Sequence, residues 1–417
     1  MQQERAATGQ DLNKPAVEQR QSRYRYVIAG LMLALNFGFG LSFFAASPVL
    51  PLVMDDYDAS RATASLLTSL VILVVAAVQF PGSMLVGRLP LKKQIAIGWL
   101  LGSANVFTFL AGSFPAVLGL RLSYAIGYAL VFPAIGPLLM QWFRPKELAL
   151  VNSLNIAVLS AGISIATFSA APLAGAFGWK AALSLFGGAS LIGALVWVAL
   201  GRTQENAGTA QRLPLFGELV AALRSRTVLV LAAADAGAYG QYAALTTWLP
   251  TFYYEAHGMS LERAGALTGI LPFMGMGTVL LAGLLSLRFP RRKPYFIVAG
   301  VCTGLGGFGA FLLAGTPMMY AALIAVGFGA WFYIPAFITI PMELPGVTPR
   351  RVAAMGAILG GFGSTLAFIA PLAVGALTDL TGTYVLGFVL FAALSWSLLA
   401  GGVLLPETGA AGATKKA

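Results

Sequence analysis

Two ionisable residues lie well inside apolar segments of the sequence, where an ionised side chain is costly. Asp235 lies roughly 13 Å past Arg226, and Arg121 lies roughly 9 Å from the nearer end of its segment, at about 1.5 Å per helical residue. A charge at such depth costs roughly 2.5–3.5 kcal/mol on insertion scales and usually serves a function. Asp235 could carry a proton, because burial favours the neutral carboxyl group. Arg121 could hold an anion through its fork of N–H donors.

Other polar and aromatic side chains share the helical faces of these two residues. Tyr239 and Tyr242 follow Asp235 at i+4 and i+7, and so lie on one side of the same predicted helix. Asn36 lies one internal repeat before Asp235, at the matching place in the first apolar segment. The residues that we expect to bind substrate are Arg121, Tyr124, Tyr128, Asn36, Tyr239, Tyr242 and Tyr333, with Asp235 as the proton-coupling residue.

Asp235 and Arg121 each have a structural interpretation as well. A buried aspartate can be hydrogen-bonded to a backbone or hydroxyl group and so fix the packing of two helices. An arginine near the end of its segment can extend its charge to the surface or hold neighbouring helices together. Both alternatives stay open, although an arginine that stays charged inside a cavity favours an anionic partner by charge compensation.

A second group of candidates lies where apolar segments end. Arg88 follows the second segment, Arg288 and Arg291 follow the eighth, and we expect these three to act as hinge residues. Glu343 closes the tenth segment. We expect it to act as a gate by pairing with basic hinge residues such as Arg144, Arg350 or Arg351.

Residues for enzyme catalysis or a metal site are not grouped in this sequence. The only histidine, His257, and the only cysteine, Cys302, lie in different segments. A structural zinc site needs several such side chains, and a catalytic centre needs a clustered set. No Gly-x-x-x-x-Gly-Lys-Ser/Thr loop occurs, which argues against ATP as the energy source. We therefore expect a protein that is not an enzyme and has no cofactor or metal.

The composition predicts the elements that position these candidates. Hydrophobic residues make up 58% of the chain, charged residues 10%, and the mean hydropathy is +0.81, whereas soluble domains are roughly 25% charged. Twelve apolar segments are long enough to cross a ~30 Å hydrocarbon core. The sequence thus predicts an all-α membrane protein with 12 transmembrane helices, at 26–52, 62–86, 94–113, 116–142, 148–174, 180–200, 227–254, 263–287, 295–314, 317–342, 352–377 and 383–404.

The net charge of +11 is a topology signal. A nucleic-acid partner would need a basic patch, but nearly all Lys and Arg lie in the terminal and alternate loops on one side of the predicted segments, and the exceptions are Arg61, Arg121, Lys180 and Arg263. Basic loops of membrane proteins stay in the cytoplasm. We therefore expect a multi-pass protein of the inner membrane with both termini cytoplasmic and no nucleic-acid partner.

Several motifs recur about 200 residues later, as in transporters built from repeated bundles. Leu-Pro at 50–51 matches Leu-Pro at 249–250, Ala-Pro-Leu-Ala at 171–174 matches the same run at 370–373, and a basic hinge at 88–93 matches one at 288–293. The repeats predict two pseudo-symmetric six-helix bundles. We expect a polar tail at 1–22, bundles at 23–200 and 227–405, a linker at 201–226 with a short amphipathic helix, and a second tail at 406–417.

The hinge resembles the motif Gly-x-Leu-x-Asp-Arg-x-Gly-Arg-Arg of the major facilitator superfamily, and the resemblance covers essentially the whole chain. The hinge keeps Arg88, Lys92 and Lys93, but Gly87 replaces the aspartate and Pro90 the second glycine. The fourth segment partly keeps the family's Arg-x-x-x-Gly-x-Gly motif at 121–127. The resemblance implies that spans 1, 4, 7 and 10 line a central cavity between two rocking bundles.

Within that family, the runs Thr-Trp-Leu-Pro-Thr-Phe at 247–252 and Asp-Leu-Thr-Gly-Thr-Tyr at 379–384 are most similar to cyanate-type and oxalate/formate-type porters. The signatures of nitrate carriers and sugar porters are absent, and the drug-antiporter motif survives only in part. We expect a monomeric secondary transporter that moves a small anionic solute, coupled to protons, by alternating access. The alternatives are proton-driven efflux of amphiphilic drugs, and a uniporter or exchanger without proton coupling.

Overall fold

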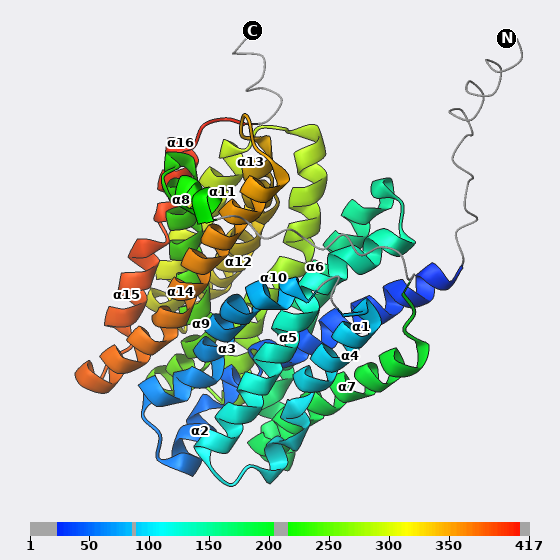
Figure 1. The fold of residues 1–417 in the computed structure, drawn as a ribbon. Helices are drawn as coiled ribbons and strands as arrows, with labels where there is room; N and C mark the ends of the chain where they lie inside the picture. The colour runs from blue at the N-terminus through cyan, green and yellow to red at the C-terminus, as the bar shows by residue number, and fades with distance from the viewer. Residues whose placement is uncertain (1–22, 86–88, 204–215, 409–417) are drawn as a thin grey trace, which may run out of the picture.

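The regular elements of the chain are all helical in the computed structural model, which describes residues 23–85, 89–203 and 216–408 (Figure 1). The first helix set is α1 Tyr24–Phe43, η1 Ser47–Val49, α2 Leu50–Tyr57, α3 Arg61–Met84, α4 Leu91–Gly102, η2 Ala104–Leu110, α5 Phe114–Trp142, α6 Pro145–Phe177 and α7 Trp179–Leu200. After α8, Phe216–Leu223, the second set is α9 Arg226–His257, α10 Leu261–Arg288, α11 Lys293–Leu312, α12 Met318–Phe332, α13 Ile334–Glu343, α14 Pro349–Thr381, α15 Val385–Leu394 and α16 Ser397–Leu404.

Eleven helical stretches of the described chain are long and apolar enough to cross a membrane. The predicted segment 94–113 is helical but broken, because α4 ends at Gly102 and the 3-10 helix η2 follows. Ser103 donates its hydroxyl proton to the carbonyl of Trp99 at 2.8 Å, and Thr108 donates to Asn105 at 2.7 Å. Such bonds from side chain to backbone bend a helix and compete with its own hydrogen bonds.

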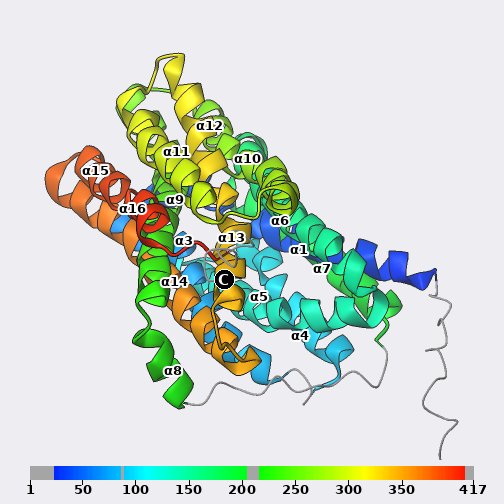
Figure 2. The same ribbon diagram turned by 90° about the horizontal axis from the view of Figure 1, so that it is seen from above.

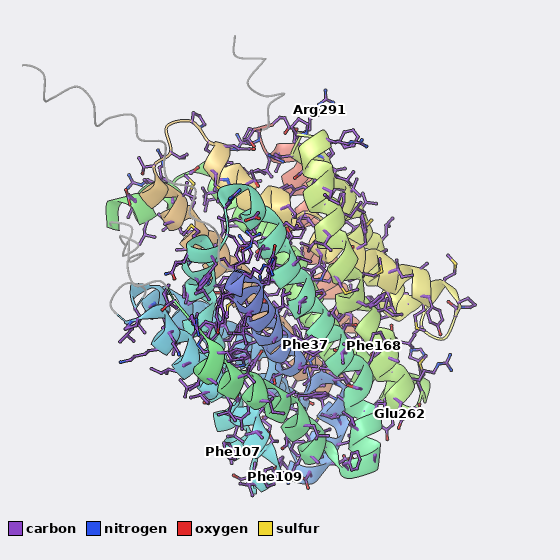
Figure 3. The ribbon with its side chains drawn as sticks, turned by 90° about the vertical axis from the view of Figure 1, so that its right-hand side faces the viewer. Phe37, Phe107, Phe109, Phe168, Glu262 and Arg291 are labelled. Carbon is purple, nitrogen blue, oxygen red and sulfur yellow. The ribbon has the colours of Figure 1, made fainter. Side chains whose placement is uncertain are left out.

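The helices form two six-helix bundles that meet along two seams. Helix α6 lies beside α10, where a methyl group added to Gly269 would lie 2.9 Å from the ring of Phe168 (Figures 2 and 3). Helix α14 lies beside α3, where a methyl group on Gly375 would lie 2.9 Å from the backbone nitrogen of Ala62. Small residues allow helices to approach this closely, so glycine sets the spacing of both seams.

The buried side chains divide into three clusters that follow the two bundles. One cluster belongs to α1–α7 alone, with Trp99 and Trp197 at its centre, and a second belongs to α8–α16, with Phe296 and Tyr333. A third joins both bundles around Trp248 and extends to the ends of α2, α9 and α14. The bundles thus share a core toward one end of the molecule and have separate cores toward the other.

Each of the two ends of the molecule has a characteristic arginine, which we use to name it. The end where α3 begins and α9 ends is the Arg61 end, and the end where α10 gives way to α11 is the Arg292 end. Glu262 and Arg291 mark opposite ends of α10 and lie far apart along the molecule (Figure 3). The shared cluster reaches Trp179 and Tyr384, which lie at the Arg61 end.

The amphipathic helix expected in the linker is present as α8, Phe216–Leu223, which packs against α14. Its position on a membrane surface stays a prediction. The exact domain boundaries also stay predictions, although α7 ends at Leu200 and α9 begins at Arg226.

Candidate functional site

Asp235 is held between two helices of the second bundle. Its side chain is 7% exposed, and the Tyr333 hydroxyl donates to its Oδ1 atom at 2.7 Å. Tyr333 stands at the break between α12 and α13, where Pro335 occupies the first turn of α13. Because of this break, Tyr333 belongs to neither helix. The hydroxyl that donates to Asp235 is therefore held at a helix break. The sequence names both residues as site candidates, and the structure brings them together.

Gly363 of α14 completes the surroundings of Asp235. A methyl group at this glycine would overlap the carboxylate and would lie 3.7 Å from the ring of Tyr239, so only glycine leaves the space that the acid fills. Tyr239 is half-buried on the same face of α9. No charged side chain of the described chain forms an ion pair with Asp235. The acid is therefore stabilised by one neutral hydroxyl.

Asn36 occupies the matching place in the first bundle and has its own polar partner. Its amide nitrogen donates to Oδ1 of Asn155 at 2.7 Å and to the carbonyl of Met32 at 3.0 Å. Both asparagines are buried, at 3% and 5% exposure. Each bundle thus holds one polar pair between its first helix and another helix. The first pair is neutral, whereas the second contains the acid.

Arg121 binds backbone carbonyls in the first bundle. Its Nε donates to Leu67 at 2.8 Å, one Nη donates to Phe43 at 2.7 Å, and the other donates to Ser42. The side chain is 2% exposed, and no carboxylate of the described residues lies within ion-pair distance of it. Arg121 therefore joins α5 to α1 and α3, and its positive charge is left without a negative partner.

The predicted tyrosines extend from Arg121 toward the second bundle. The Tyr124 ring lies 5.4 Å from the Arg121 guanidinium, and its hydroxyl donates to the carbonyl of Phe39 at 2.6 Å. The Tyr128 ring packs on Phe39 with ring centres 4.9 Å apart. Tyr242 of α9 packs on Phe44, the residue directly after α1, with ring centres 6.2 Å apart, and this contact joins the two bundles.

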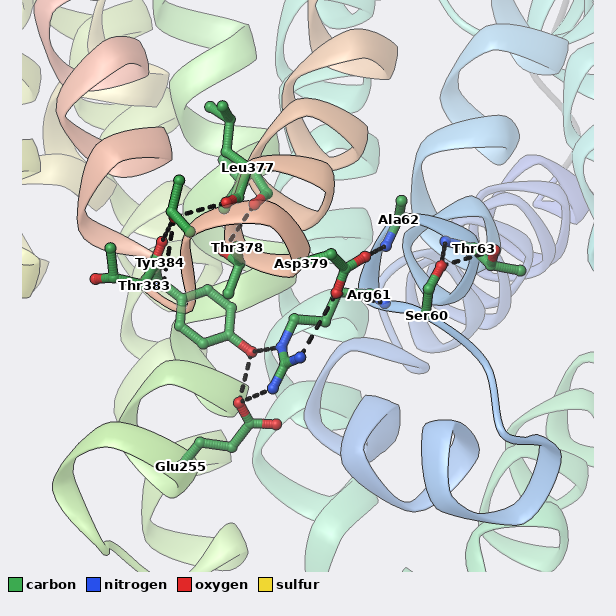
Figure 4. A network of polar contacts seen from close by, with 12 residues as sticks. Ser60, Arg61, Ala62, Thr63, Glu255, Leu377, Thr378, Asp379, Thr383 and Tyr384 are labelled. Atoms are coloured by element: carbon green, nitrogen blue, oxygen red, sulfur yellow. Dashed lines mark hydrogen bonds and ion pairs between the residues drawn. The ribbon is translucent and has the colours of Figure 1, made fainter.

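A polar network links the two bundles at the Arg61 end, and the sequence does not predict it (Figure 4). Arg61 at the start of α3 pairs with Glu255 of α9 at 2.8 Å and with Asp379 of α14 at 3.5 Å. Its Nε also donates to the Tyr384 hydroxyl at 2.8 Å. One arginine of the first bundle thus binds three side chains of the second, and we call these four residues the Arg61 network.

Backbone groups and burial strengthen this network. The Asp379 carboxylate accepts hydrogen bonds from the backbone N–H groups of Arg61 at 3.3 Å and Ala62 at 3.1 Å, at the start of α3. A carboxylate is favoured there because a helix N-terminus carries partial positive charge. Burial raises the pKa of Tyr384, so its hydroxyl keeps the proton that it donates to Glu255 at 2.8 Å.

At the Arg292 end, the ion pairs among the described residues each lie within a single bundle. Glu343 pairs with Arg292 at 2.6 Å and accepts a hydrogen bond from Thr408 at 2.8 Å. Glu343 thus pairs with a basic hinge residue as expected, but its partner is Arg292 and not Arg144, Arg350 or Arg351, because the α10–α11 loop brings Arg292 to the end of α13 in the same bundle. In the first bundle, Arg25 pairs with Glu147 at 3.2 Å.

In the described part of the chain, the predicted hinge residues form no side-chain hydrogen bond or ion pair with the residues of the candidate site. Arg288 and Arg291 are exposed at the end of α10, and Arg88 lies outside the described residues. Their role as hinges stays a prediction.

The family model of the Major Facilitator Superfamily matches residues 32–367, which is most of the chain. The chain belongs to the Major Facilitator Superfamily. It is therefore a secondary transporter rather than an enzyme, as the sequence predicts.

Solved and curated relatives agree with this assignment. A bacterial homologue of the human lysosomal transporter Spinster, solved in an inward-facing and unoccupied conformation, superposes with a TM-score of 0.70 at 18% identity over 92% of this chain and 95% of its own. Such low identity shows the shared fold only.

Three curated relatives are named for small anions. They are a probable sulfoacetate transporter of Cupriavidus necator (23% identical, over 89% of this chain and 91% of the relative), a nitrite extrusion protein of Bacillus subtilis (26%, over 89% and 91%) and a cyanate transport protein of Escherichia coli (22%, over 84% and 89%).

In this Major Facilitator Superfamily transporter, the Arg61→Gln substitution is expected to weaken the contact between the bundles. Arg61 is 33% exposed, so each pair contributes about 0–1 kcal/mol, and loss of the network should favour separation of the Arg61 end by roughly threefold to tenfold. A cysteine at the buried Thr247, which hydrogen-bonds to Thr68 of the other bundle, reports this opening as faster thiol labelling in a chain whose own Cys302 is replaced.

Lys180→Gln is the matched control, because Lys180 pairs with Asp56 of its own bundle at 2.9 Å. This control should not change the labelling rate at position 247. Equal rates in the Arg61 variant and its parent would show that the network does not hold the bundles together.

Proposed function

We propose that this transporter moves a small anion together with a proton by alternating access. The observation that carries the proposal is a pair of lone buried charges. Arg121 in the first bundle and Asp235 in the second are almost fully buried, and each is held by neutral groups instead of an opposite charge. Buried charges are costly unless they are compensated, so both charges are available to a substrate and a coupling ion.

The sum of the Arg121 and Asp235 charges favours the binding of a proton together with an anion. When Asp235 is ionised and no substrate is bound, the two charges cancel. When a monovalent anion enters, a proton on Asp235 keeps the sum at zero. The same sum predicts one proton for each monovalent anion.

The relatives named for sulfoacetate, hexuronate, nitrite, galactarate or glucarate, and cyanate support an anionic substrate. Arg121 would act on the anion by its charge, because its N–H groups bind Ser42, Phe43 and Leu67. Tyr239, Tyr242 and Asn36 remain our candidates for the lining of the site.

The arrangement of the bundles supports alternating access of residues 23–200 against 227–405. The bundles are bonded to each other at the Arg61 end, whereas the ion pairs at the Arg292 end stay within one bundle. If the basic loops and both termini lie in the cytoplasm, the Arg61 end faces the outside, and this form is closed on the external side. The Arg61 network is then the external gate.

A direct test is uptake by the purified chain in liposomes under an imposed pH gradient. The panel contains cyanate, nitrite, formate and a hexuronate, which carry one charge, and sulfoacetate, oxalate and glucarate, which carry two. We expect the gradient to drive accumulation of at least one anion. Transport of amphiphilic cations alone would indicate drug efflux instead, and anion counterflow without any pH dependence would indicate a uniporter or exchanger.

A further inference from the structure

Three polar groups without hydrogen-bond partners gather where the bundles meet. They are the hydroxyl of Tyr242, the indole N–H of Trp331 and the hydroxyl of Thr246. The rings of Tyr242 and Trp331 stand perpendicular to each other, with centres 6.0 Å apart. The indole N–H and the Thr246 hydroxyl lie beside the Tyr242 hydroxyl without completing a hydrogen bond to it. Tyr242 is 5% exposed and Thr246 is fully buried.

Helices from both bundles converge on this group. Phe44, directly after α1 of the first bundle, packs on Tyr242 of α9. From α10, Gly275 faces the indole so closely that an added methyl group would lie 2.7 Å from its nitrogen and 2.6 Å from the Ser160 hydroxyl of α6. Ser160 itself is satisfied, because it donates to the carbonyl of Pro272 at 2.6 Å. The unpaired groups therefore lie at the contact that must separate and reform if the bundles rock.

All three unpaired groups can donate a hydrogen bond, and this indicates a ligand that accepts hydrogen bonds. A buried polar group without a partner is costly, and such exceptions are few in native proteins. The indole nitrogen is a donor only, and the two hydroxyls can donate as well. An anionic group can accept a hydrogen bond from each of the three, whereas a cation gains nothing from the indole N–H. All three donors are neutral, so they add no charge to that of Arg121.

We propose that Tyr242, Trp331 and Thr246 bind the charged group of a monovalent anion through neutral hydrogen bonds. This inference rests on the proposed function and deepens it. The single charge follows because Arg121 is the one buried cation among the described residues, and its N–H groups bind carbonyls. A second negative charge on the ligand would have no positive partner there.

The test compares unpaired with paired side chains of the same type. Tyr242→Phe and Trp331→Phe each remove an unpaired donor. Their controls are Tyr253→Phe, where the hydroxyl donates to Ala310 at 2.6 Å, and Trp248→Phe, where the indole donates to Pro371 at 2.8 Å. The full chain is purified in detergent, and affinity is measured from the shift of the unfolding temperature with cyanate, nitrite, formate and a hexuronate, and with the divalent anions oxalate and glucarate.

We expect Tyr242→Phe and Trp331→Phe to weaken anion affinity by roughly tenfold to a hundredfold, the range for one hydrogen bond to a charged group. Tyr242→Phe should leave the unfolding temperature of the unliganded protein unchanged or raise it, because it removes an unsatisfied group. The controls should do the reverse, with a lower unfolding temperature and unchanged affinity.

Three outcomes would be adverse, and each has a separate meaning. Unchanged affinity in both variants, with a wild type that binds an anion, would overturn the binding role of this group. Tighter binding of oxalate than formate, or of glucarate than the hexuronate, would overturn the single charge. A wild type that binds none of these anions would instead contradict the proposed function.

Discussion

Asp235→Asn is expected to abolish the accumulation of anion that a pH gradient drives, while exchange of one anion for another continues. Asparagine has nearly the same shape as aspartate, and its amide oxygen can accept the Tyr333 hydrogen bond that now measures 2.7 Å. It cannot take up or release a proton. We expect net uptake to fall on the order of 100-fold, as when a positioned proton-transfer group is lost, and radiolabelled uptake and counterflow in liposomes measure the two activities separately.

The control for this substitution is the same chemical change at the Arg61 network. Asp379→Asn alters a carboxylate that binds Arg61 and the start of α3, so it should affect the rate of transport and leave its coupling to protons intact. If Asp235→Asn still accumulates the anion as the wild type does, Asp235 is a packing residue and the proton is carried elsewhere.

Arg121→Ala is expected to destabilise the folded transporter, in addition to any effect on transport. The substitution leaves the carbonyls of Ser42, Phe43 and Leu67 without their donor. An unsatisfied buried group costs about 1–3 kcal/mol, so we expect a loss of at least about 3 kcal/mol. Thermal unfolding in detergent measures the loss, and Arg121→Lys should recover only part of it, because an ammonium group lacks the planar fork of donors.

Arg288→Ala is the control for this prediction, since Arg288 is exposed at the end of α10. Its unfolding temperature should match that of the wild type. If Arg121→Ala unfolds at the wild-type temperature and only loses anion binding, then Arg121 contacts the substrate directly and does not hold α5 against α1 and α3.

The sequence predicts the fold well because the signals for it are local or repeated. Apolar length predicts the helices, and the recurrence of motifs predicts the two bundles. Asp235 is recognisable as a site residue because it is a lone acid in an apolar segment. The broken segment at 94–113 also has a local signal in Ser103 and Thr108, but average hydropathy does not register it.

Contacts between distant segments could not be predicted in the same way. Asn36 pairs with Asn155, and Glu343 pairs with Arg292, because of the rotation of each helix within its bundle, and no local pattern encodes that rotation. The Arg61 network joins residues from three separate stretches of the chain. The one sequence signal for the network is that Arg61 lies on the predicted side of the membrane that has few basic residues. A basic residue on that side is unusual and therefore marks a candidate for a specific contact.

Proton-coupled anion transport by this chain requires that Asp235 carries the proton that accompanies the anion. The direct measurement is the pH inside liposomes that contain the purified chain and a pH-sensitive dye, after addition of the anions of the panel. We expect a monovalent anion to trigger proton entry in the wild type, seen as a fall in internal pH. Asp235→Asn should abolish this fall in pH without stopping anion counterflow. Net entry of the anion into wild-type liposomes with no change in internal pH would contradict proton coupling.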